Sequence, residues 1–293
     1  MKGLINVGNT CYFNSTLQCL LNCTPLVNYF YKSRYTGDRK AVKDFENIVN
    51  KYWKSDDNVV NPIELLKELA VWSPQFGGNY QQDSHEAFLC IIEGLHKETQ
   101  SDKQIFNDSP YYKLVKDGPA KKQWEEENSS LVTHLFNGQL KVTVSDVHYE
   151  TFRSIEIAPT YNTNVDALLF DFFKSETTVD TKQTIQKQIQ FPPLCMTLAF
   201  KQYFKKLDIK FTETLDLSWY MAKDHNAPFK PEYQLYGIIL HGGDRHGGHY
   251  ISATKNLNSW YLNNDSRSSK VDLKSIDVNS IYMLFYIIKK PYL

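Results

Sequence analysis

Residues 9 to 21 read NTCYFNSTLQCLL, and this stretch indicates how the first half of the chain folds. Asn9 and Thr10 are both suitable helix caps. Apolar residues then recur at the spacing of one helix face, namely Phe13, Leu17, Leu20 and Leu21. Cys11 is therefore expected in the first turn of an amphipathic helix, with its sulfur near the positive end of the helix dipole.

Three further helices are expected before residue 100. Their apolar stripes run over residues 42–52, 65–69 and 88–95. Asn61 and Pro62 precede the second stripe, in the cap and first helical positions. Asp83 and Glu86 have the spacing of a capping box at the start of the third. The first half of the chain is therefore expected to be helical.

Beyond about residue 133 the hydrophobic period changes to that of strands. Leu140, Val142 and Val144 alternate with polar residues, and Ile155 with Ile157 indicates the partner strand. Further strands are expected at residues 194–199, 233–240, 249–254, 259–262 and 281–288. Helices followed by strands predict an α+β fold, in which a cleft between the two lobes is a natural ligand site.

The composition limits the classes of function. The 293 residues include 33 basic and 33 acidic side chains, so no net charge attracts nucleic acid or an anionic membrane. The longest hydrophobic run, residues 281–288, is far shorter than the roughly 18 residues that cross a bilayer. No signal peptide is recognised at the N-terminus, so we expect an intracellular protein. The five cysteines include no Cys-x-x-Cys pair, which disfavours a disulfide framework and a zinc cluster.

Cys11 is the candidate nucleophile, because a helix N-terminus lowers the pKa of a thiol. Taken alone, it fits a packed first-turn thiol equally well. The candidate base is one of His241, His246 and His249; His249 begins an alternating strand and is thereby fixed, whereas His246 lies among glycines. These histidines lack an acidic or thiolate partner at a familiar metal-binding spacing. A hairpin loop with solvated histidines remains the simpler alternative.

A histidine base requires a partner for its second ring nitrogen. Asn264 and Asp265 end the next expected strand, which antiparallel pairing would place beside His249. Asn6, five residues before Cys11, carries an amide that can stabilise an oxyanion together with the Cys11 backbone N–H. Both asparagine-containing segments are also typical of ordinary turns.

Three ordered motifs resemble those of the ubiquitin-specific proteases, a family of papain-like cysteine deubiquitinases. Residues 3–18, GLINVGNTCYFNSTLQ, are similar to the cysteine box of that family. Residues 81–88, QQDSHEAF, resemble its Gln-Gln-Asp-x-x-Glu-Phe segment, and residues 236–250, 260–266 and 282–286 resemble its histidine box. Three motifs in the correct order are far more specific than any one of them.

The resemblance implies one catalytic domain of papain-like α+β fold over residues 1–293. Residues 1–132 would form a helical thumb and residues 133–293 a palm of antiparallel strands. The fingers, around residues 140–190, look shortened and free of metal, because this segment has no cysteine for the two Cys-x-x-Cys zinc pairs common in the family. The usual Leu-Lys-Arg-Phe strand is altered to LAFK at residues 198–201. No cofactor is expected.

The resemblance also assigns catalytic roles. It implies Cys11 as the nucleophile, His249 as the base and Asn264 as the residue that orients the base. It places Asn6 at the oxyanion hole, with Asp265 as the neighbour that assists or substitutes.

The resemblance implies that the C-terminal tail of ubiquitin lies between thumb and palm. Asp83 and Glu86 would bind the arginines of that tail, with Gln82, Gly248 and Tyr250 beside it. The expected reaction is hydrolysis of the peptide or isopeptide bond after the terminal glycine of ubiquitin, by a monomer in the cytoplasm or nucleus. Two alternatives remain open: a protease for another ubiquitin-like modifier, and an inactive ubiquitin-binding module.

Overall fold

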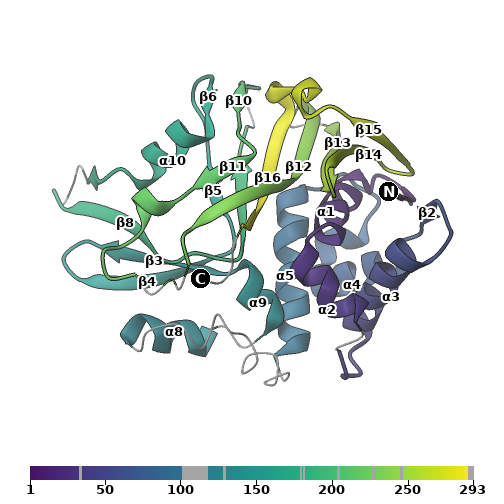
Figure 1. Ribbon diagram of the computed structural model, residues 1–293, viewed down its shortest axis with the longest axis horizontal. Coiled ribbons are helices and arrows are strands. Elements are labelled where there is room, and N and C mark those ends of the chain that lie inside the picture. The colour runs from purple at the N-terminus through teal and green to yellow at the C-terminus, as the bar shows by residue number, and fades with distance from the viewer. Residues whose placement is uncertain are drawn as a thin grey trace.

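The structure is a computed structural model, which describes residues 1–32, 35–100, 118–127, 130–178, 180, 182–202, 205–225, 227, 229–244 and 247–289. Helices gather on one side of a long central sheet, and a second sheet extends from the other side (Figure 1). The expected α+β fold is thus confirmed. Buried side chains from the helices and from both sheets join in one hydrophobic core.

The helical side is formed by the first part of the chain. Its helices are α1 (Cys11–Leu21), α2 (Thr24–Tyr31), α3 (Lys40–Lys54), α4 (Ile63–Trp72) and α5 (Ser84–Thr99). Every residue of α1 is buried, because the central sheet covers one side of this helix and α2 and α5 cover the other. A helix enclosed in this way fixes the position of its first residue, Cys11.

The central sheet carries the predicted histidine box. Its strand order is β15, β14, β13, β12, β16, β9 and β5, with the short β11 paired to β12. The strands are β5 (Ile155–Ile157), β9 (Cys195–Phe200), β11 (Thr214–Asp216), β12 (Glu232–Asp244), β13 (Gly247–Asn256), β14 (Ser259–Asn264), β15 (Arg267–Val271) and β16 (Ile281–Ile288). Neighbours are antiparallel except β5 and β9.

The second sheet corrects one predicted pairing. Its order is β4 (Val147–Phe152), β3 (Gly138–Thr143), β8 (Thr184–Phe191) and β7 (Glu176–Thr177). The expected pairing of residues 155–157 with β3 is wrong, because β5 pairs with β9 instead. The hairpin partner of β3 is β4, which the sequence did not reveal because most of its side chains are partly or fully exposed.

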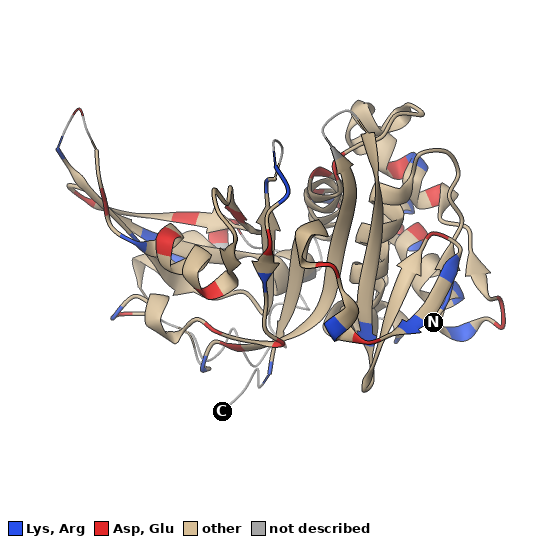
Figure 2. Cartoon of the chain, turned by 90° about the horizontal axis from the view of Figure 1, so that it is seen from above, with Lys and Arg blue, Asp and Glu red and all other residues tan. Residues whose placement is uncertain are grey.

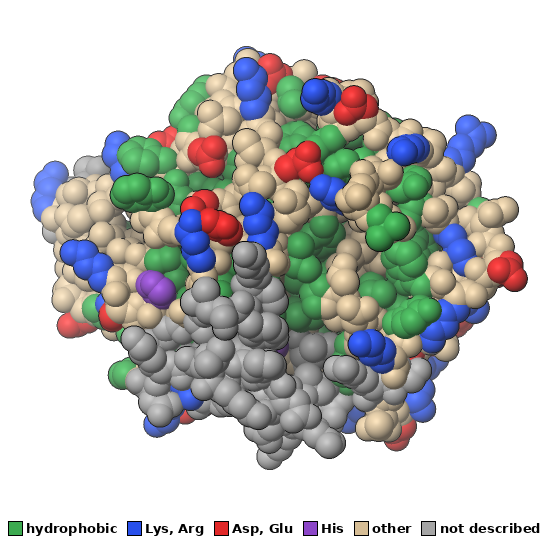
Figure 3. All heavy atoms as spheres, viewed as in Figure 1, with side chains coloured by type: hydrophobic (Ala, Val, Ile, Leu, Met, Phe, Trp, Pro, Cys, Tyr) green, Lys and Arg blue, Asp and Glu red, His purple; other side chains and the backbone are tan. Residues whose placement is uncertain are grey.

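Short elements complete the described chain. They are β1 (Gly3–Leu4), β2 (Val59–Val60), β6 (Thr163–Asn164), β10 (Ile209–Lys210), α8 (Pro119–Glu127), α9 (Leu131–Phe136), α10 (Val165–Phe173) and the 3₁₀ turns at Pro74–Gly77, Ser218–Tyr220, Leu273–Ser275 and Val278–Ser280. Basic and acidic residues are interspersed over the ribbon and over the face that Figure 3 shows (Figures 2 and 3). Among the described residues, no helix is both long and apolar enough to cross a membrane.

The N-terminal segment packs on the hairpin between β14 and β15. The backbone N–H of Leu4 donates to the carbonyl oxygen of Asp265 at 2.8 Å. A Cβ atom on Gly3 would lie 2.1 Å from the carbonyl oxygen of Ser266, so only glycine allows this approach. This contact brings Asn6 next to Asp265, although 259 positions separate them in sequence.

Candidate active site

Cys11 begins α1 after a turn with unusual backbone geometry. Gly8 and Asn9 have positive φ angles of 115° and 51°, and the side-chain oxygen of Asn6 accepts hydrogen bonds from the N–H groups of Gly8 and Thr10. Asn6 therefore organises the turn that delivers Cys11 to the helix start. The Cys11 side chain is 2% exposed.

The environment of Cys11 favours the protonated thiol. Burial raises its pKa, the backbone N–H of Tyr250 lowers it, and the negative charge of Asp265 raises it again; the net shift is upward. The helix N-terminus was expected to lower the pKa of this thiol, and desolvation outweighs that effect. A nucleophilic Cys11 therefore needs a base.

His249 and Asn264 are joined directly. Nε2 of His249 lies 2.8 Å from Oδ1 of Asn264, and both residues are exposed. Because an amide oxygen only accepts hydrogen bonds, Nε2 carries the proton and Nδ1 has the lone pair that can take up another. Strand pairing explains this contact. Ser252 of β13 pairs with Asn263 of β14, so the start of β13, which carries His249, lies beside the end of β14, which carries Asn264.

Cys11 and His249 lie on adjacent segments. The sulfur of Cys11 is next to the backbone N–H of Tyr250, the residue that follows His249. Within the described residues, no hydrogen bond joins this sulfur to the imidazole ring. Catalytic hydrogen bonds are often long without substrate and tighten when it binds. The structure thus places the three predicted side chains on neighbouring segments, and no hydrogen bond joins the thiol of Cys11 to the ring of His249 in the described part of the chain.

Asp265 holds two asparagines of the N-terminal segment. Its Oδ2 accepts from Nδ2 of Asn6 at 2.9 Å, and its Oδ1 accepts from Nδ2 of Asn14 at 2.8 Å. The partner of His249 in this structure is therefore Asn264, whereas Asp265 fixes the predicted oxyanion-hole residue. Sequence reasoning missed Asn14, although a polar residue three positions after Cys11 on a buried helix face requires a partner.

Gln81 is a second residue that sequence reasoning missed. Its Nε2 donates to the carbonyl oxygen of Gly248 at 2.7 Å, and its Oε1 accepts from the N–H of Gly248 at 2.9 Å. Gln81 precedes α5, so it connects the helical side to the residue just before His249. A side chain on Gly248 would collide with His241 and the carbonyl of Gly242, which explains the glycine. In the sequence, Gln81 could have been identified as the first residue of the QQD segment.

The predicted tail-binding residues differ in availability. Asp83 caps α5 by accepting from the N–H groups of His85 and Glu86, and its second oxygen is held by Lys201 and the Tyr282 hydroxyl. Burial raises the pKa of Asp83, but Lys201 and these hydrogen bonds outweigh it and leave the pKa below its usual value.

Glu86 and Gln82 are held more loosely. Glu86 is exposed and accepts one hydrogen bond from Gln75 at 3.2 Å. Gln82 donates to the backbone carbonyl of Gln75 at 2.9 Å. Of the two predicted carboxylates, Glu86 is therefore the one with free acceptor capacity.

Aromatic packing supports β13, the strand that carries His249. The ring of Tyr250 stacks on His241 at 4.3 Å and meets Tyr282 edge-on at 5.5 Å. Nδ1 of His241 lies 3.1 Å from the Lys206 ammonium, a cation that opposes metal binding at this ring. His246 lies outside the described residues. Among those that are described, no cluster of His, Cys, Asp or Glu side chains could hold a metal ion.

Comparison with known proteins gives the family. The sequence profile described as "Ubiquitin carboxyl-terminal hydrolase" matches residues 2–286. This match covers nearly the whole chain. The chain belongs to the ubiquitin carboxyl-terminal hydrolase family.

Individual relatives have low sequence identity to this chain, at 26% or 27%. Ubiquitin carboxyl-terminal hydrolase 2 of Bos taurus is 26% identical over 343 residues, covering 99% of this chain and 55% of the relative. The protein of the same name in Homo sapiens is 26% identical, covering 99% and 56%. Hydrolase 16 of Arabidopsis thaliana is 27% identical over 321 residues, covering 97% and 30%. This chain spans at most about half the length of these relatives.

Solved structures share the fold. The SAGA deubiquitinating module Ubp8/Sgf11/Sus1/Sgf73 bound to monoubiquitin contains a chain that matches with a TM-score of 0.78 at 21% identity, covering 99% of this chain and 69% of that one. The same module bound to ubiquitin aldehyde matches with a TM-score of 0.76 at 22% identity, covering 99% and 70%.

Proposed function

We propose that this chain hydrolyses the peptide or isopeptide bond after the C-terminal glycine of ubiquitin. The observation that carries the proposal is the 2.8 Å hydrogen bond between His249 and Asn264, placed beside the buried helix start that bears Cys11. A thiol nucleophile, an imidazole base and an amide that orients the base are the catalytic groups of a cysteine protease. Family membership and the ubiquitin bound in solved structures with this fold support the same substrate.

The geometry suggests a division of roles. His249 takes the proton of Cys11 through Nδ1 while Asn264 holds Nε2, and the thiolate attacks the glycine carbonyl. The backbone N–H of Cys11 and the Nδ2 group of Asn6 donate to the tetrahedral oxyanion. His249 then protonates the leaving amine, and water hydrolyses the thioester. Because Asp265 uses one proton of the Asn6 amide, the second proton remains for the oxyanion.

Recognition of the basic tail falls mainly to Glu86 in this proposal. An arginine of the tail forms a charge-assisted hydrogen bond with a free carboxylate. Asp83 contributes negative potential, but its oxygens already serve the α5 cap, Lys201 and Tyr282. Gln82 and the backbone of Gly248 line the same passage.

Action as a monomer inside the cell is part of the proposal. The matching chains with this fold belong to modules of several subunits. Light scattering of the purified chain, with and without ubiquitin, therefore tests whether it acts as a monomer.

A ubiquitin probe with an electrophilic C-terminus tests the function. We expect covalent capture at Cys11, cleavage of a fluorogenic ubiquitin conjugate, and loss of both in Cys11→Ala. If parallel assays with several ubiquitin-like modifiers show preferential cleavage of one of them, that modifier rather than ubiquitin is the substrate. Reversible binding without capture or turnover would instead show an inactive binding module and contradict the proposal.

A further inference from the structure

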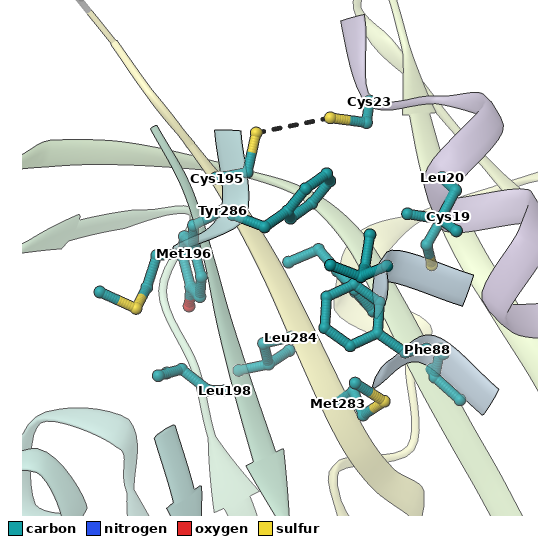
Figure 4. Packing of buried hydrophobic residues seen from close by; sticks show 14 of the residues in the cluster. Cys19, Leu20, Cys23, Phe88, Cys195, Met196, Leu198, Met283, Leu284 and Tyr286 are labelled. Carbon is teal, nitrogen blue, oxygen red and sulfur yellow. Dashed lines mark hydrogen bonds between the residues drawn. The ribbon is translucent and has the colours of Figure 1, made fainter. Parts of the chain in front are cut away.

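Two buried cysteines that take no part in the proposed catalysis lie next to each other. The sulfur atoms of Cys23 and Cys195 are 3.4 Å apart (Figure 4), although 172 positions separate the residues in sequence. Both thiols are free, and their residues are at most 1% exposed. We infer that Cys23 and Cys195 form a reversible disulfide that joins the helical side of the molecule to the central sheet.

The two residues sit on different parts of the fold. Cys23 is the N-cap residue of α2, directly after the corner that follows α1. Cys195 is the first residue of β9, where it pairs with Ile287 of β16. A bond between them would therefore connect the far end of α1, whose first residue is Cys11, to a central strand of the sheet.

The required movement is small. A disulfide places its sulfur atoms about 2.05 Å apart, so the observed pair must approach by little more than about 1 Å. Adjustment of the two side-chain torsions supplies a shift of this size without moving a strand. Both residues belong to the hydrophobic core, where packed neighbouring side chains hold the two thiols close together.

The surroundings distinguish the two thiols. Burial raises the pKa of Cys195 well above its ordinary value. For Cys23, burial also raises the pKa, but the Cys195 thiol, the backbone N–H of Leu26 and the Tyr236 hydroxyl lower it below its ordinary value. The donors around Cys23 favour its thiolate, the nucleophilic form, over that of Cys195.

A small peroxide is the oxidant that balances the reaction. The Cys23 thiolate attacks one oxygen of hydrogen peroxide, which leaves a sulfenic acid on Cys23 and releases hydroxide; the hydroxide takes up the proton that the thiol lost. The sulfur of Cys195 then attacks the sulfur of the sulfenic acid, forms the S–S bond and expels water. In total, two thiols lose two electrons and two protons, and one peroxide is reduced to two waters.

The experiment uses the full chain with Cys11→Ala, which removes the competing active-site thiol. The folded protein is treated with hydrogen peroxide, quenched with catalase, alkylated after denaturation and digested without reductant. We expect mass spectrometry to find one linked peptide pair, Cys23 with Cys195. Closing so long a loop should raise the Tm by roughly 5 °C or more, and dithiothreitol should reverse the shift.

Cys19 provides the matched control, because it is equally buried and lies four positions before Cys23. Cys11→Ala/Cys19→Ser should still form the link, and Cys11→Ala/Cys195→Ser should not. Because the unaltered pair is read directly by mass spectrometry, the inference stays testable even where a variant folds poorly. It is overturned if the folded chain keeps both thiols alkylatable, if Cys19 is linked instead, or if the link forms only after denaturation.

Discussion

At the residue scale, the chemistry depends on a thiol whose surroundings oppose its ionisation. Burial and the charge of Asp265 both raise the pKa of Cys11. These effects favour the protonated thiol, so in the proposed mechanism the proton of Cys11 moves to His249 during the reaction. This explains why His249 is held by a residue, Asn264, that leaves its other nitrogen available.

The first prediction concerns the base and its partner. Cys11→Ala and His249→Ala should each reduce kcat for a fluorogenic ubiquitin conjugate by about 10⁴-fold or more. Asn264→Ala should reduce kcat less, by roughly 10- to 10³-fold, because the imidazole is present but poorly oriented. Steady-state and burst-phase kinetics with the fluorogenic conjugate measure these values. A loss in Asn264→Ala as large as that in His249→Ala would contradict the assigned role.

The second prediction concerns Asp265. Asp265→Asn removes a negative charge that raises the pKa of Cys11, so that pKa should fall. The rate of alkylation by iodoacetamide, measured against pH, should accordingly show a lower midpoint. Turnover should nevertheless drop about 10-fold, since an asparagine cannot accept from both Asn6 and Asn14 in the same way.

Asp272→Asn is the matched control for this change. Asp272 lies in the same region of sequence, and its side chain accepts a backbone hydrogen bond from Lys274. It should leave the alkylation midpoint and the turnover unchanged. An unchanged midpoint in Asp265→Asn would show that the carboxylate does not act on the thiol.

Individual site residues were predictable where a motif named them. Cys11, His249, Asn264 and Asn6 were singled out from helix position, strand position and resemblance, and the structure places them on neighbouring segments. Their catalytic roles stay predictions. The division between Asn264 and Asp265 was not readable, because it depends on the approach of Gly3 to Ser266, a contact between the N-terminal segment and the β14–β15 hairpin.

At the element scale, one side chain connects the helical side to the strand of the base. Gln81 makes two hydrogen bonds with Gly248 that resemble those of a strand partner. The start of β13 is thereby tied to the segment before α5. We expect this connection to determine how well His249 is placed beside Cys11.

The third prediction tests this connection. Gln81→Ala should lower kcat/KM for ubiquitin conjugates by about 10-fold or more, because even a small displacement of a catalytic group lowers the reaction rate strongly. Gln123→Ala is the matched control, because Gln123 also donates to a backbone carbonyl of another element, that of Tyr149, far from the site in sequence. Equal losses in both variants, or none in Gln81→Ala, would contradict the positioning role.

Helices and strands were predictable where their buried apolar residues recur with a clear helical or strand period. β16 has the predicted bounds, and α1, α3, α4 and α5 lie on the predicted stripes. β4 was missed because its side chains are largely exposed, and α2 because its eight residues are too short for a helical period to stand out. The wrong partner for residues 155–157 shows that register between distant strands is a tertiary property.

At the scale of the whole molecule, stability should depend on buried neutral histidines. Burial lowers the pKa of His85 to about 4, with Lys201 adding to the shift, and burial lowers the pKa of His134 to about 4 as well. Both residues are buried, so their protonation opposes folding of the chain. The fold class was predictable from the sequence; this acid sensitivity was not, because burial of a particular ring follows from packing.

The last prediction gives the sign of this effect. Below its ordinary pKa of about 6.5, each histidine is protonated in the unfolded chain, whereas the folded chain resists protonation until the pH approaches 4. The unfolded state then binds more protons, so the free energy of unfolding should fall as the pH falls from about 6.5 to about 4. Urea unfolding at several pH values measures this slope. His85→Gln, whose amide can keep the contact with Ser154, should reduce the slope by up to about 1.4 kcal/mol per pH unit. His148→Gln, on the exposed surface of β4, should leave it unchanged; equal slopes in all three proteins would show that buried His85 does not govern the acid response.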